Sequence, residues 1–100
     1  MAARFRLTPN AESQLGDILE FIATDSESAA VRVRDAMYEA FGLLASHPQM
    51  GHARQDLTAR PLRFWSVYSY LVVYDPSCEP LAILAVLHGA RDVEQILRNP

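Results

Sequence analysis

Lysine is absent from this chain of 100 residues, cysteine occurs once, and long apolar runs are missing. The absence of lysine removes every lysine-based catalytic role and leaves nine arginines, whose guanidinium groups bind carboxylates and phosphates. The single cysteine, Cys78, cannot form an internal disulfide. No stretch approaches the roughly 18 consecutive apolar residues of a membrane helix, and residues 1–7 lack the apolar run of a secretion signal. We therefore expect a cytoplasmic protein with no membrane association.

Positive charge is also scarce, because nine arginines stand against twelve acidic side chains, giving a formal net charge of −3. A protein that binds nucleic acid by neutralising many phosphates usually carries an excess of basic residues. We therefore expect no direct sequence-specific binding to nucleic acid. Residues 1–50 hold four arginines and seven acids, whereas residues 51–100 hold five of each. A site that uses arginine is accordingly expected in the second half.

The apolar residues that are present, half of the chain, suffice for one core, and the length suits one domain over residues 1–100. Residues 4–7 alternate polar and apolar side chains as a short strand does. Thr8-Pro9 then supplies an N-cap and a first-turn proline, which predicts a helix to about Ala23. An apolar stripe with helical spacing runs along this helix, and a second one follows the capping residues at 24–28. The sequence therefore predicts two antiparallel helices joined by a short turn.

The second helix is expected to end at His47–Gly51, after which a loop continues to about Ala59. Residues 62–67 and 68–74 are rich in aromatic and β-branched side chains, and they could pair as a hairpin. A turn rich in proline follows them. The apolar run at 81–87 then fits a central strand covered on both faces. With a last short helix from Asp92 to Leu97, the predicted order is β-α-α-β-β-β-α.

Four short segments with this order and spacing carry a resemblance to a known family. They are Leu7–Ala11, His47–Gly51, Tyr70–Tyr74 and Val86–Asp92. Together they resemble the ParE branch of the RelE/ParE family of toxins from bacterial toxin–antitoxin modules, over nearly the whole chain. The resemblance implies an α+β fold in which a helical hairpin packs on a small antiparallel sheet. It also implies a cognate ParD-like antitoxin as partner and DNA gyrase as target.

The other branch of the family consists of RelE-like ribonucleases that cut messenger RNA on the ribosome. These enzymes typically use lysines and arginines on the middle strands and a tyrosine near the C-terminus. Here Leu71 and Leu97 occupy the positions of one such arginine and of the tyrosine. Because catalytic groups of one constellation act as a unit, their loss should cost orders of magnitude in rate. We therefore expect a toxin that works by binding, with no catalytic residue, cofactor or metal.

Two alternatives remain open at the level of sequence. One is a ribosome-dependent ribonuclease with an altered site built from Arg63, His88 and Arg91. The other is a degenerate homologue that binds its antitoxin but has lost toxicity. Cleaved transcripts would distinguish the first alternative, and harmless expression without antitoxin would distinguish the second.

Candidate target contacts lie mostly in the second half of the chain. Arg63 could reach from the sheet toward a carboxylate or phosphate, and Trp65 alternates with it on the same face. A solvated arginine and a core tryptophan are the structural alternatives. For His88 and Arg91, a strand-end hydrogen bond and a salt bridge or helix cap carry more weight than a target contact. The candidates are Arg60, Arg63, Trp65, His88 and Arg91.

Candidate antitoxin contacts are aromatic. Tyr38 and Phe41 lie beside the apolar stripe of the second helix and could line a groove for an amphipathic helix. An unpaired sheet edge offers a second docking mode, the addition of a strand. The sequence does not choose between the modes. The candidates are Tyr38, Phe41, Tyr68 and Tyr70.

Overall fold

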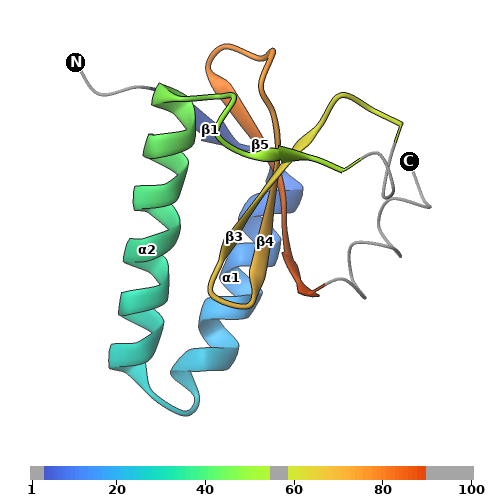
Figure 1. Ribbon diagram of the computed structural model, residues 1–100. Coiled ribbons are helices and arrows are strands. Elements are labelled where there is room, and N and C mark those ends of the chain that lie inside the picture. The colour runs from blue at the N-terminus through green and yellow to red at the C-terminus, as the bar shows by residue number, and fades with distance from the viewer. Residues whose placement is uncertain (1–3, 55–58, 90–100) are drawn as a thin grey trace.

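The computed structural model describes residues 4–54 and 59–89. Its two helices and five strands confirm the α+β class and follow the predicted order (Figure 1). The predicted helix from Asp92 to Leu97 and candidate Arg91 lie outside the described residues. The elements are β1 (Phe5–Leu7), α1 (Pro9–Ala23), α2 (Glu27–Ser46), β2 (His52–Ala53), β3 (Arg63–Val67), β4 (Tyr70–Asp75) and β5 (Leu81–His88).

Both helices begin at the caps that the sequence indicates. The Thr8 hydroxyl accepts a hydrogen bond from the Ala11 N–H at 3.2 Å, and Pro9 occupies the first turn of α1. The Ser26 hydroxyl caps α2 in the same way, accepting from the Ala29 N–H at 3.1 Å. Each cap satisfies a backbone donor that lacks a partner within its helix. The two helices form an antiparallel hairpin, with their connecting turn at the bottom of the view in Figure 1.

The sheet has the strand order β1-β5-β4-β3-β2. Its β5·β4 and β4·β3 pairs are antiparallel, as expected, and so is the β3·β2 pair, but β1 and β5 are parallel, so the sheet is mixed. The alternating pattern of a strand carries no information on its direction, which depends on the crossover through the helical hairpin. His52–Ala53, expected within a loop, forms the short strand β2. Two residues are too few for any periodicity to predict.

The helical hairpin covers one face of the sheet (Figure 1). The larger core cluster joins this face to the helices, because it contains the buried Met37, Phe41 and Leu44 of α2 together with buried side chains of β4 and β5. A smaller cluster, which contains Phe64 and Val73, lies on the opposite face. β5 contributes buried side chains to both clusters, as its apolar sequence predicts. No helix within the described ranges is long and apolar enough to cross a membrane.

Candidate functional site

Arg63 and Tyr74 hold the loop that follows α2 against the sheet. The Tyr74 hydroxyl donates to the Pro48 carbonyl oxygen at 2.7 Å and accepts from the Gly51 N–H at 2.8 Å. Arg63 Nη1 donates to the carbonyl oxygens of Gly51 at 2.6 Å and Gln49 at 3.4 Å. The sequence presents Arg63 as a target contact, whereas the structure engages part of its guanidinium within the chain. These four bonds fix the path from α2 into β2.

Burial keeps the Tyr74 hydroxyl protonated. Desolvation raises the pKa of Tyr74 above its ordinary value, and the Gly51 hydrogen bond and the charge of Arg63 oppose the shift only in part. The hydroxyl therefore stays protonated at neutral pH and can donate to the Pro48 carbonyl oxygen. No acidic side chain is needed to hold the loop.

Trp65 is half buried and packs against the larger core cluster. Its ring stacks on that of His52, with centroids 6.4 Å apart and planes inclined by 15°. The ring of Trp65 thus contacts both the core and the edge strand β2. Its role in target binding stays a prediction.

Arg60 is exposed in the segment before β3. The pKa of Asp75 is lowered mainly by hydrogen bonds from Ser77, with smaller contributions from Cys78 and from the positive charge of Arg60.

His88 lies at the end of β5, opposite Tyr70 of β4, and their ring centroids are 5.1 Å apart. Arg63 pairs with Tyr74, four residues along β4 from Tyr70. That offset is about 13 Å along the strands, and two strand spacings add about 10 Å across the sheet. The Cα atoms of Arg63 and His88 are therefore roughly 16 Å apart. The fold does not bring these two candidates into one site.

Tyr68 occupies the two-residue loop between β3 and β4, which Val67 and Tyr70 close by pairing. Its side chain is 68% exposed and its φ is +54°, a conformation that is uncommon outside glycine. Tyr70, by contrast, is partly buried against the larger core cluster. The two tyrosines therefore differ in availability to a partner: Tyr68 is open and Tyr70 is mostly covered.

Tyr38 and Phe41 belong to an aromatic cluster between α2 and β1. The Tyr38 ring lies 6.0 Å from the Phe5 ring and 5.4 Å from the Phe41 ring, centroid to centroid. Tyr38 is 44% exposed, but Phe41 is completely buried. The buried Phe41 ring therefore packs against the Tyr38 ring, and of the two only Tyr38 is accessible to an incoming helix.

The open edge of the sheet beside β2 offers the second docking mode. β2 pairs with Arg63 and Phe64 only, so Trp65–Val67 has no partner on that edge among the described strands. In a two-residue hairpin the residues that close the loop are hydrogen-bonded to each other, and outward-facing residues alternate with them. Ser66 therefore directs its backbone groups outward. An extended segment of a partner could pair with them.

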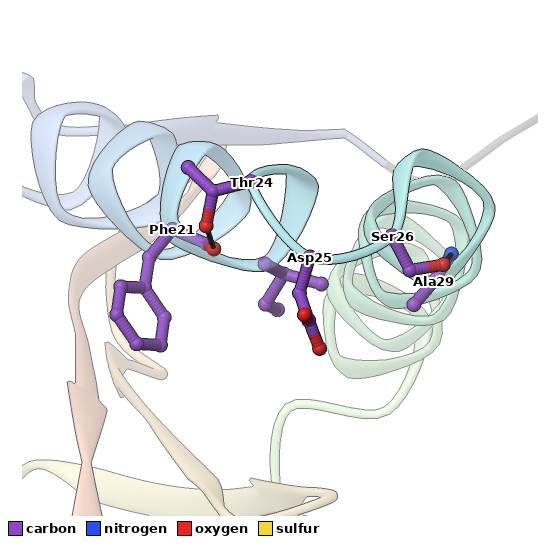
Figure 2. Close-up of a pocket in the computed structure, with 6 residues that line it drawn as sticks. Phe21, Thr24, Asp25, Ser26 and Ala29 are labelled. Carbon is purple, nitrogen blue, oxygen red and sulfur yellow. Dashed lines mark hydrogen bonds between the residues drawn. The ribbon is translucent and has the colours of Figure 1, made fainter.

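A further surface was not predicted from the sequence. A shallow hollow opens at the turn between α1 and α2, lined by Phe21, Ile22, Thr24, Asp25, Ser26 and Ala29 (Figure 2). Phe21 is 78% exposed, more than any other large apolar side chain in the described residues. The sequence feature that could have indicated this surface is the position of Phe21 outside the apolar stripe of α1.

Among the described residues, no group of three or more histidine, cysteine or acidic side chains is arranged to hold a metal ion. The surfaces described above consist of aromatic rings, an open strand edge and a few charged groups. Such features suit contacts with other proteins.

Comparison with known proteins adds a family and a fold. The profile of the family described as "ParE toxin of type II toxin-antitoxin system, parDE" matches residues 5–93. A chain of the solved structure titled "Chromosomal ParDE TA system from P. aeruginosa" superposes with a TM-score of 0.69. The similarity covers 88% of this chain and 97% of that chain at 14% sequence identity. No curated protein sequence matches this chain.

Proposed function

Because this chain belongs to the ParE toxin family of type II toxin–antitoxin systems, we propose that it is the toxin of such a module. In this proposal a cognate ParD-like antitoxin neutralises it, and the free toxin binds DNA gyrase in the cytoplasm and inhibits it without catalysing a reaction. The observation that carries the proposal is the family match over residues 5–93. The gyrase target follows from the resemblance to the ParE branch.

The geometry of the sheet supports a binding mechanism. A ribonuclease would need its acid, base and cationic groups close to one scissile phosphate. Arg63 is engaged with the carbonyl oxygens of the Gln49–Gly51 loop, and His88 lies at the far end of the sheet against Tyr70. Leu71 adds no charge between them. These positions favour inhibition by contact over cleavage of RNA.

Two surfaces suit the antitoxin. Tyr38 offers a half-exposed ring backed by Phe5 and Phe41, and an amphipathic helix could pack its apolar side there. The open edge at Trp65–Val67 could accept an extended segment of the same antitoxin. A partner that uses both would contact α2 and the sheet edge at once.

Expression of the free chain in bacterial cells tests the proposal and separates it from its alternatives. We expect growth arrest that co-expressed antitoxin relieves, with messenger RNA remaining intact in primer-extension assays. Cleaved transcripts would instead indicate a RelE-like ribonuclease. Harmless expression of folded protein would indicate a degenerate homologue that has lost its toxicity.

A further inference from the structure

The turn between α1 and α2 presents an aromatic ring and a carboxylate together. Phe21 and Asp25 project to the same side of the turn, above the hollow that Ile22 and Ala29 help to line (Figure 2). The Phe21 ring is 78% exposed and contributes no buried core contact that would explain its size. An exposed aromatic face beside a carboxylate is a favourable environment for a cationic side chain.

The backbone of the turn is held in place by side-chain hydrogen bonds. The Thr24 hydroxyl donates to the Phe21 carbonyl oxygen at 2.6 Å, and the Ser26 hydroxyl caps α2 at the Ala29 N–H. The backbone N–H groups of Asp25 and Ser26 both donate hydrogen bonds to the Ile22 carbonyl oxygen. A turn that is already ordered loses less conformational entropy when a partner binds.

The electrostatics of the turn also favour a cation. α1 ends here, and its last turn contains no basic residue to balance the partial negative charge of its C-terminus. Glu20, three residues before Ala23 at the end of α1, adds a negative charge close to the turn. The positive end of α2 is already balanced by Glu27 in its first turn. The hollow therefore combines the Asp25 carboxylate and the carbonyl end of α1 with an apolar ring.

We propose that this turn binds an arginine or lysine side chain of the toxin's protein target, with the cationic group on the Phe21 face and paired with Asp25. The inference rests on the proposed function, because it assigns the surface to gyrase. Tyr38, on the surface suited to the antitoxin, lies eleven residues beyond Glu27, about 17 Å along α2. The separation lets the two surfaces be altered independently.

Supercoiling inhibition by purified toxin variants tests this assignment. Phe21→Leu keeps an apolar side chain but removes the ring, and Asp25→Asn removes the charge. We expect Phe21→Leu to raise the toxin concentration for half-inhibition by about 2- to 30-fold, which is the range of a cation–π contact. We expect Asp25→Asn to raise it by up to about 5-fold, which is the range of an exposed ion pair. Asp25→Lys, which places like charges together, should raise it further. Leu43→Ala on α2 and Asp17→Asn on α1 are matched controls that should inhibit as the unmodified toxin does.

Thermal unfolding and binding to purified antitoxin show that each variant is folded. Loss of inhibition with antitoxin binding intact would support the assignment. Full inhibition by Asp25→Lys would overturn it and leave the proposed function standing. A variant that inhibits normally but binds antitoxin weakly would also overturn it, because the occupant would then be the antitoxin. A lack of inhibition by the unmodified toxin would overturn both proposals.

Discussion

Tyr74 links the sheet to the loop after α2 through one hydroxyl group. Its ring is completely buried, and its oxygen donates to the Pro48 carbonyl oxygen and accepts from the Gly51 N–H. A buried polar atom is costly unless it is paired, so these two bonds allow a tyrosine here, whereas a phenylalanine would leave only the Arg63 bonds to hold the loop. The fit depends on the small size of residue 51.

Substitution of Gly51 by alanine should destabilise the protein by about 1–3 kcal/mol, the usual cost of overpacking a filled site. A Cβ at this position would meet the hydroxyl of Tyr74 and lie 2.7 Å from its Cε1. Chemical denaturation of Gly51→Ala, compared with Gly42→Ala, measures the effect. A Cβ at Gly42 meets nothing within 4 Å. Equal stability of the two variants would contradict the close packing of Gly51 against Tyr74.

Individual residues were the least predictable part of the candidate site. Arg63 and Trp65 were correctly expected on β3, but their partners Gly51 and His52 lie twelve and thirteen residues earlier in the chain. No local pattern reports such a contact. Phe41 illustrates the same limit, because helical spacing predicted a position beside the apolar stripe of α2 but not its complete burial.

The elements themselves followed from local chemistry. Thr8-Pro9 and Ser26 mark the starts of α1 and α2 through their caps, and both caps are present in the structure. The apolar run of β5 predicted a strand buried on both faces. The parallel direction of β1 and the pairing of β2 were not predictable, because each depends on contacts between distant segments.

The β3–β4 hairpin carries local strain at Tyr68. A non-glycine residue with φ of +54° costs about 1–2 kcal/mol in the left-handed region. Since the ring is mostly exposed, Tyr68→Gly should remove this cost with little loss of packing and stabilise the protein by roughly 0.5–1 kcal/mol. Thermal and chemical unfolding would measure the gain. Ser69→Gly is the control, and a lower stability of Tyr68→Gly would show that contacts of the ring outweigh the strain.

At the scale of the whole molecule, the fold separates groups that the sequence allowed to act together. Arg63 and His88 are at opposite ends of the sheet, and the exposed aromatic rings of Tyr38, Phe21 and Tyr68 lie on different elements. A molecule with several separate contact surfaces suits a protein that engages an antitoxin and a target by different faces. This arrangement underlies the proposal of inhibition by binding.

The most direct measurement is gyrase supercoiling of relaxed plasmid with purified toxin, with and without excess antitoxin, while linear DNA is scored. The account predicts that the toxin blocks supercoiling or traps cleaved DNA, and that antitoxin reverses the effect. Unchanged supercoiling at a toxin concentration well above that of gyrase would contradict it.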